Sequence, residues 1–219
     1  MAAQETLSPR QIVVTGEGLV QAAPDMATLS IGVGHEAPSA AEAMAEVSAT
    51  VQQVFTRLTE LGVAQRDVQT ASLRIDPIWR ERNRSTPEEV PEIVGFRANN
   101  DLTIRLRDMA QLGAIIGVLI ADGANRLSGI GFGVESPEVY LTEARRLAVV
   151  DAQARAALYA KAAGVELGPV LEIVEPNGGG MPGPMYARAE SMSMASDVPV
   201  AAGEMTFSAQ VRMTFAIAR

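Results

Sequence analysis

Apolar and polar residues follow two different periods along the chain, and the change of period predicts strands alternating with helices. Residues 27–33 place an apolar side chain at every second position, as a strand with one buried face does. Between residues 44 and 61 the apolar residues recur at helical spacing, behind a capping box formed by Ser39 and Glu42. Gly62 then ends this helix, because glycine readily takes the left-handed conformation found at helix C-termini.

The same two periods predict the remaining elements. Alternation indicates further strands over residues 11–20, 72–80, 94–106, 127–135, 169–175 and 205–217. Two more helices are expected, one capped by Asp108 and closed by Gly123, the other beginning at Ser136 and Pro137 and ending at Gly164. The order β-β-α-β-β-α-β-α-β-β, with hairpin-like pairs of long strands, predicts an α+β fold. We expect an antiparallel or mixed sheet with the helices packed on one face.

Glycines interrupt two of the predicted strands. Gly16 and Gly18 are two residues apart in the first strand, which predicts a bulge or the close approach of another backbone. Gly129, Gly131 and Gly133 alternate in a later strand and leave one of its faces bare. Their spacing resembles half of a dinucleotide-binding loop, but the strand–glycine–helix context of that loop is missing. We therefore expect a helix or a neighbouring strand to pack over these glycines.

Length and local composition predict a single domain over residues 11–219. A chain of 219 residues is long enough to bury a sizeable core, and 47% of its residues are hydrophobic. Residues 1–10 are polar and predict a flexible tail of the kind that remains after signal-peptide cleavage. Residues 176–203 contain three consecutive glycines, several prolines and several serines, and predict a flexible internal loop.

Composition and charge exclude several classes of protein. The formal net charge is −8, and no basic stripe of the kind that binds nucleic acid is present. The chain has no cysteine, which excludes disulfides, thiolate zinc sites and cysteine nucleophiles. The longest apolar run, residues 109–121, is too short to span a bilayer.

No set of residues forms a recognisable catalytic or cofactor site. His35 is the only histidine and falls on the apolar side of its strand, which favours a structural role over a ligand or triad role. Asp25, Asp101 and Asp122 are expected near turns, where aspartate commonly hydrogen-bonds its own backbone. We therefore predict no enzyme activity, no catalytic residue and no cofactor.

Four methionines within the predicted loop are the candidate metal ligands: Met181, Met185, Met192 and Met194. Thioether sulfur suits Cu(I), so weak copper binding is one interpretation. Methionine also forms adaptable contact surfaces and reacts with oxidants. The cluster is therefore consistent with an ordinary loop, a subunit contact, a Cu(I) site or a scavenger of oxidants.

Several short blocks of sequence resemble the SIMPL-domain family. Residues 14–18 (VTGEG) and 23–27 (APDMA) look like the N-terminal signature of that family. The likeness continues in order through residues 61–63, 67–70, 95–100, 123–126, 148–152, 164–168 and 199–215. Seven residues match the family's motifs and are candidates for a structural role: Gly16, Gly18, Pro24, Asp25, Asn100, Gly123 and Asn125. The methionine-bearing loop is not part of the resemblance.

The resemblance implies an exported protein of the bacterial envelope. Bacterial members of the family are periplasmic or outer-membrane-associated, include immunogenic proteins of pathogens, have been linked to protection from oxidative stress and tend to self-assemble. No catalytic residues are established for the family. We therefore interpret the chain as a non-enzymatic periplasmic protein that forms homo-oligomers and contacts envelope proteins. Two alternatives stay open: a small-molecule or Cu(I)-binding protein or enzyme that uses carboxylates and the methionine-bearing loop, and a signalling adaptor like the mammalian namesake of the family.

Overall fold

The computed structural model describes residues 10–80, 91–176 and 200–218. In this part of the chain the predicted order of seven strands and three helices is confirmed, with two short 3₁₀ turns at Gln65–Asp67 and Met109–Gln111. Every strand pairing is antiparallel, and the α+β class is confirmed. The four candidate methionines and nearly all of the expected N-terminal tail lie outside the described residues.

The chain divides into two compact units, each with its own sheet. Unit 1 combines the described residues 10–23, 134–176 and 203–218, so it draws strands from both ends of the chain. Unit 2 is mainly the continuous segment Pro24–Gly133. The predicted behaviour of residues 11–219 as a single domain stays a prediction.

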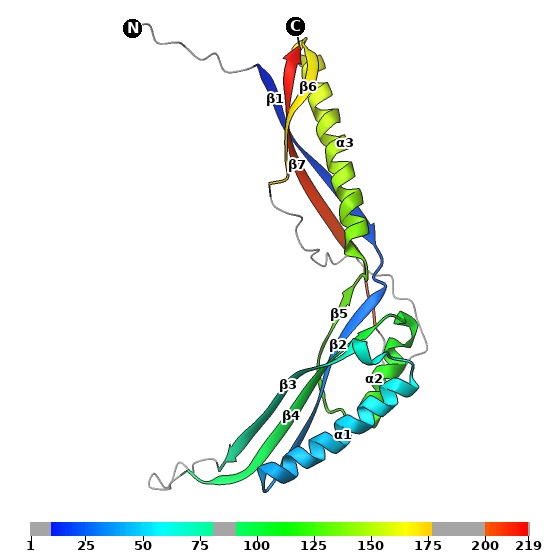
Figure 1. Cartoon of the computed structure of the whole chain (residues 1–219), viewed down its shortest axis with the longest axis vertical. Coiled ribbons are helices and arrows are strands. Elements are labelled where there is room, and N and C mark those ends of the chain that lie inside the picture. Colours follow the sequence, from blue (N-terminus) through cyan, green and yellow to red (C-terminus); the bar gives the residue numbers. More distant parts are fainter. Residues whose placement is uncertain (1–9, 81–90, 177–199, 219) are drawn as a thin grey trace. The chain divides into compact units, whose positions relative to one another are not determined.

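Unit 1 is a three-stranded sheet with one helix on one face (Figure 1). Its strands are, in spatial order, β1 (Gln11–Ala22), β7 (Met205–Ala218) and β6 (Glu166–Val174). The helix α3 (Pro137–Ala163) packs mainly on β1 and β7. Alternate residues of β7 from Met205 to Phe215 are buried, as the sequence predicts. The helix meets them with a stripe of small residues: Ala144, Ala148, Ala152 and Ala156.

The glycines of β1 allow α3 to lie directly on the strand. A Cβ added at Gly16 would lie 2.1 Å from the carbonyl oxygen of Ala148. One added at Gly18 would lie 1.9 Å from the carbonyl oxygen of Ala144. The predicted close approach of another backbone is therefore confirmed, and glycine is required at these positions by the space and not by the backbone angles.

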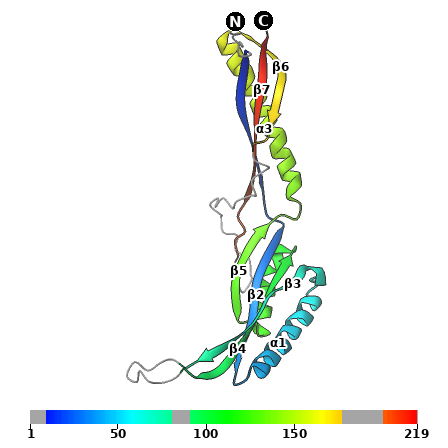
Figure 2. The ribbon, with the colours of Figure 1, turned by 60° about the vertical axis from the view of Figure 1, so that its left-hand side comes forward.

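Unit 2 is a four-stranded sheet with two helices on one face (Figures 1 and 2). Its strands are, in spatial order, β3 (Val68–Trp79), β4 (Ile93–Leu106), β2 (Met26–Ala37) and β5 (Arg126–Gly133). The helices are α1 (Ala40–Glu60) and α2 (Leu112–Ala121). The capping box of Ser39 and Glu42 forms as predicted, and Gly62 and Gly123 take positive φ angles after the two helices.

The core of unit 2 lies between its sheet and its helices. Leu29 and Ile31 of β2 and Ile104 of β4 are at most 1% exposed, and they pack against Leu58 of α1 and Ile116 of α2. Burying each such side chain contributes about 1.5–3 kcal/mol relative to leaving it in water. The opposite face of the sheet is left uncovered by both helices (Figure 2).

Two expectations from the sequence are wrong in whole or in part. The first two strands do not form a hairpin, because β1 pairs with β7 and β2 pairs with β4 and β5. The expected packing over the glycines of β5 is missing at Gly129, where no atom of the described residues lies within 4 Å of an added Cβ. It is present at Gly133, where the Cε atom of Met26 on β2 lies 3.6 Å from an added Cβ.

Among the helices that the structure describes, none is both long enough and apolar enough to cross a membrane.

Candidate functional site

The face of the unit 2 sheet that points away from α1 and α2 carries a cluster of charged and amide side chains. Strand alternation sends Arg97, Asn99 and Asp101 of β4 to this face, since the residues between them point toward the helices. They line a hollow of about 390 Å³ together with side chains from β3 and β5. We call this the polar hollow, and its lining residues are Arg74, Asp76, Arg97, Asn99, Asp101 and Arg126.

The register of the strands arranges the polar hollow in three rows across the sheet. The rows are Ser72, Asp101 and Gly32; Arg74, Asn99 and Gly34; and Asp76, Arg97 and Glu36. Neighbouring rows are about 7 Å apart, because two residues of a strand rise that far. Arg126 stands opposite Gly32, so it enters from the other edge of the sheet.

Two glycines of β2 form the floor of the polar hollow. A Cβ added at Gly32 would lie 2.4 Å from Oδ1 of Asp101, and one added at Gly34 would lie 2.8 Å from Oδ1 of Asn99. The Cδ atom of Arg126 lies 3.5 Å from the same Gly34 position. Because β2 has no side chains at these positions, its neighbours lean over it from both sides.

Asp101 lies in the middle of β4, and the expectation that it belongs to a turn is wrong. The hydroxyl of Ser72 donates a hydrogen bond of 2.7 Å to Oδ2 of Asp101. The other oxygen, Oδ1, is buried without a hydrogen bond, and Nε of Arg126 lies 3.7 Å from it. Asp101 therefore retains an unused acceptor. Leaving a buried polar atom unpaired in this way costs about 1–3 kcal/mol.

Three other side chains of the polar hollow have unused hydrogen-bonding groups. Asn99 is 7% exposed, yet no hydrogen bond within the described part of the chain involves its side chain. The exposed side chains of Arg74 and Asp76 likewise have neither a hydrogen bond nor an ion pair to described residues. Arg97 differs, because both its Nε and its Nη2 donate to Oε1 of Glu36.

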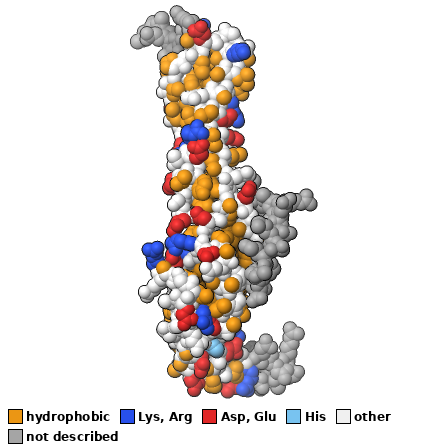
Figure 3. Space-filling model, turned by 90° about the vertical axis from the view of Figure 1, so that its right-hand side faces the viewer, with side chains coloured by type: hydrophobic (Ala, Val, Ile, Leu, Met, Phe, Trp, Pro, Cys, Tyr) orange, Lys and Arg blue, Asp and Glu red, His pale blue; other side chains and the backbone are white. Residues whose placement is uncertain are grey.

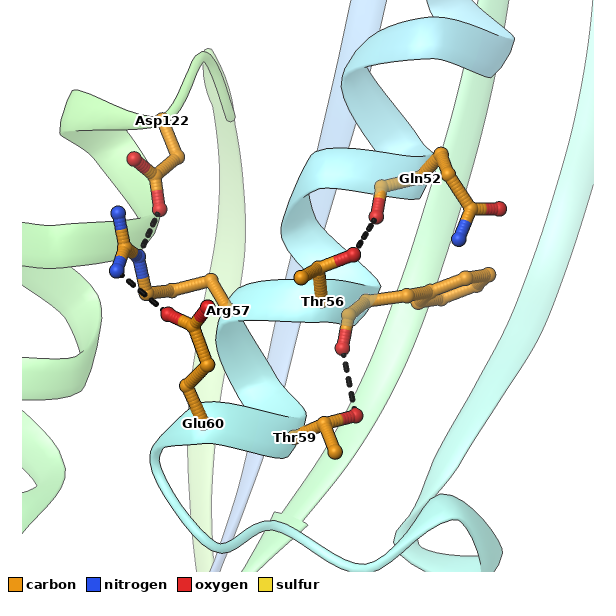
Figure 4. Close-up of polar contacts among 7 residues, drawn as sticks. Gln52, Thr56, Arg57, Thr59, Glu60 and Asp122 are labelled. Carbon is orange, nitrogen blue, oxygen red and sulfur yellow. Dashed lines mark hydrogen bonds and ion pairs between the residues drawn. The ribbon is translucent and has the colours of Figure 1, made fainter.

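A second hollow of about 430 Å³ lies beside the C-terminal ends of α1 and α2, and its charged groups already satisfy one another. Arg57 donates from Nε to Asp122 at 2.8 Å and from Nη1 to Glu60 at 2.7 Å (Figure 4). The hydrogen bond that Arg57 donates to Asp122 raises the pKa of Arg57 above its ordinary value. Thr56 is also satisfied, since its hydroxyl donates to the carbonyl of Gln52 (Figure 4). This arrangement connects two helix ends and offers few free groups to a ligand.

Neither hollow has the groups of a conventional catalytic or metal site. The described residues contain no cluster of three or more histidine, cysteine, aspartate or glutamate side chains able to hold a metal ion. The hydroxyl of Ser72 is bonded to the carboxylate of Asp101, but the lining residues of the polar hollow include no histidine, cysteine or lysine that would complete a nucleophilic set. Its guanidinium, carboxylate and amide groups are suited to binding by hydrogen bonds and charge.

The structure spreads the motif residues over both units and does not bring them together in one site. Gly16 and Gly18 serve the contact between β1 and α3 in unit 1. Pro24 and Asp25 precede β2, and the N–H of Asp25 donates to the carbonyl of Gly133. These four residues therefore shape the backbone.

Gly123 and Asn125 belong to the connection from α2 to β5. Gly123 ends α2 with a φ of +103°, a conformation that other residues rarely adopt. The side chain of Asn125 donates to the carbonyl of Gly34 and accepts from its N–H. Asn125 thereby pairs with β2 immediately before β5 begins.

Asn100 lies on the helix-facing side of β4, between Val33 and Leu73, and so does not line the polar hollow. Its Oδ1 is buried without a hydrogen-bond partner in the described part of the chain. His35 faces the same side, where its Nε2 lies 3.3 Å from the hydroxyl of Thr50 on α1.

Sequence reasoning missed the residues of the polar hollow as a site. The alternation of β4 does place Arg97, Asn99 and Asp101 on a common polar face. The alignment of β3 beside that face, and the arrival of Arg126 from β5, follow from strand register and not from any local pattern.

The chain resembles one family of known proteins along most of its length. A profile of the family described as "SIMPL: Protein of unknown function (DUF541)" matches residues 12–215. The 26 kDa periplasmic immunogenic protein of Brucella melitensis is 35% identical over 219 residues, covering 98% of this chain and 87% of that protein. The uncharacterized protein YggE of Escherichia coli is 30% identical over 206 residues, covering 93% of this chain and 80% of that protein. YggE of Edwardsiella ictaluri is 30% identical over 188 residues, covering 84% and 77%.

The fold and the polar hollow together define an α+β protein with two antiparallel sheets and a polar cluster suited to binding. The chain belongs to the SIMPL family, as its sequence blocks predict. The matched residues include all of unit 2 and most of unit 1, so the family's shared region contains strands of both sheets.

Proposed function

We propose that the chain is a non-catalytic periplasmic protein that self-assembles, and that copies meet along strand β6 of unit 1. The observation that carries this proposal is the exposure of four apolar residues in one edge strand: Val170, Leu171, Ile173 and Val174 are 42%, 53%, 57% and 40% exposed. Exposed apolar side chains gathered along one edge strand are typical of an interaction site. Hydrophobic side chains also reach the surface on the face seen in Figure 3.

The packing of α3 explains why β6 is exposed. Val170 and Ile173 stand opposite Phe215 and Met213 of β7, whose side chains are buried under the helix. Since α3 covers β1 and β7 and makes few contacts with β6, Val170 and Ile173 lie beside the helix without cover from it. An edge strand also presents unpaired main-chain groups, which favour pairing with another chain.

A second copy is the occupant that the composition of this edge favours, because the exposed patch itself carries little charge. Two copies with a formal net charge of −8 repel each other, so they associate only where apolar contact outweighs that repulsion. Between Val170 and Val174 the only charged residue is Glu172. A symmetric dimer needs no other gene product, because the same patch serves both partners.

Sedimentation velocity at several protein concentrations tests this proposal. We expect a species larger than the monomer whose fraction grows with concentration, and Ile173→Glu is expected to abolish it. The matched control is Val150→Glu on α3, which changes a residue that is 49% exposed away from the buried alanine stripe. A strict monomer at all concentrations, or equal loss of assembly in both variants, would overturn the proposal.

The proposal extends to protection of the envelope from oxidants, and here it rests on the family resemblance and on the periplasmic relatives. Assembly would concentrate the protein where it contacts envelope proteins. A deletion strain should therefore survive peroxide less well than its parent. The wild-type gene is expected to restore survival, and the gene carrying Ile173→Glu is not. Equal rescue by the two genes would show that protection does not depend on assembly.

A further inference from the structure

The polar hollow of unit 2 contains unpaired donors and unpaired acceptors side by side. Arg74 and Arg126 flank Asn99, the first from β3 and the second by leaning over Gly34. Arg74 has no partner among the described residues, and Arg126 approaches Asp101 only to 3.7 Å. Guanidinium groups in this arrangement bind carboxylates through charge-assisted hydrogen bonds.

Asn99 adds an observation that surface charge alone does not supply. Its side chain lines the hollow, although the residue as a whole is only 7% exposed. Its amide has no hydrogen bond within the described part of the chain. Unlike Oδ1 of Asn100 and Oδ1 of Asp101, the polar atoms of this amide are not fully buried, so water or a ligand in the hollow can hydrogen-bond them. Asn99 therefore offers both a donor and an acceptor to a ligand.

The acceptors of the hollow favour a ligand that carries positive charge as well. Asp76 is exposed, lies two residues from Arg74 on the same face of β3, and pairs with no described residue. The three arginines of the hollow are matched by three carboxylates, Asp76, Asp101 and Glu36, the last bound to Arg97. A multiply charged anion such as phosphate would be repelled by these carboxylates.

We propose that the polar hollow binds a small zwitterion of the amino-acid type, with a carboxylate and an ammonium group attached to the same carbon. The carboxylate is bound between Arg74 and Arg126 and accepts from the amide of Asn99. The ammonium group donates to Asp76. The side chain of such a ligand would point to solvent, because the floor of the hollow is the backbone of Gly32 and Gly34.

Titration of the full chain with glycine, followed by amide NMR, tests the proposal. Glycine is expected to shift the side-chain amide signals of Asn99 and the main-chain signals around Arg74 in a saturable way. Acetate, methylammonium and inorganic phosphate serve as comparison probes. Each is expected to bind at least about tenfold more weakly than glycine, since each lacks one of the two charges or adds one.

Two variants assign the two charges of the ligand. Arg74→Met is expected to weaken glycine binding at least about tenfold, whereas Arg212→Met, which removes an exposed arginine from β7 of unit 1, leaves it unchanged. Asp76→Asn is expected to abolish the preference for glycine over acetate while acetate still binds. Absence of a saturable shift with glycine, equal affinities for glycine and acetate in the wild type, or binding unaffected by Arg74→Met would each overturn the proposal. The NMR spectra of the variants show directly whether they are folded.

Discussion

The side chain of Asn125 forms two hydrogen bonds with the backbone of Gly34. Its Nδ2 donates to the carbonyl at 2.8 Å, and its Oδ1 accepts from the N–H at 2.9 Å. The main-chain N–H of Asn125 also donates a hydrogen bond, of 3.1 Å, to the carbonyl of Gly32. An amide side chain thus imitates a strand residue and extends the pairing of β2 beyond the start of β5.

Replacement of Asn125 by alanine is expected to destabilise the protein by about 1–2 kcal/mol, because both main-chain groups of Gly34 lose a partner. Urea denaturation followed by circular dichroism measures the change. Asn125→Asp is expected to destabilise the protein at least as much as Asn125→Ala. A carboxylate still accepts from the N–H of Gly34, but its second oxygen repels the carbonyl oxygen of Gly34. The control Gln69→Ala, at an exposed position of β3, should stay within about 0.5 kcal/mol of the wild type. A similarly small effect of Asn125→Ala would show that the amide pairing is unimportant.

Replacement of Gly18 by alanine is expected to cost about 3 kcal/mol or more, because the new methyl group would lie 1.9 Å from the carbonyl oxygen of Ala144. Strand and helix must move apart to accommodate it. Gly131→Ala in β5 is the matched control, since the nearest atom to its added Cβ is 4.0 Å away. Alanine there is expected to be neutral or to stabilise by up to about 1 kcal/mol. Equal urea midpoints for Gly18→Ala and Gly131→Ala would contradict the close contact between β1 and α3.

The local elements could be predicted from the sequence because their signals are local. The capping box of Ser39 and Glu42 and the glycine after each helix are satisfied within a few residues, so they survive whatever the rest of the chain does. The alternation of β4 is equally local, and it correctly separates Arg97 from Ala98.

Pairings between distant segments could not be predicted in this way. The sequence places β1 next to β2, but β1 finds its partner in β7 at the far end of the chain. The same limit hides the polar hollow, where Arg74, Asn99 and Arg126 come from three strands whose register no single strand encodes. The Cu(I) interpretation of Met181, Met185, Met192 and Met194 stays a prediction, because these residues lie outside the described part of the chain.

If residues 11–219 act as a single domain, as the sequence predicts, both units are expected to unfold in one transition. Unit 1 has a small core lined by alanines, and small cores bury too little apolar area to be stable alone. Trp79, the only tryptophan, lies on β3 and reports on unit 2 by fluorescence. Gly18→Ala should therefore shift the fluorescence transition together with the circular dichroism transition. A shift of the circular dichroism transition without a shift of the fluorescence transition would show that the units unfold separately.

Stability is expected to fall in acid partly through Asp67, which is 6% exposed and receives a hydrogen bond from Arg107. That hydrogen bond holds the pKa of Asp67 below its ordinary value of 3.8. The folded state therefore favours the ionised carboxylate, so its contribution is complete above pH 3.8 and is lost as the pH falls through the lower folded-state pKa.

Replacement of Asp67 by asparagine is expected to cost about 1–2 kcal/mol at neutral pH, since Arg107 is partly exposed and water compensates for some of the loss. The difference between variant and wild type should shrink as the pH is lowered below 3.8, because the wild-type carboxylate is then protonated as well. Urea denaturation at a series of pH values measures this convergence. Asp76→Asn, at an exposed carboxylate that pairs with none of the described residues, controls for the loss of one negative charge and should change stability little. A difference for Asp67→Asn that is independent of pH would assign its effect to packing and not to the ionised pair.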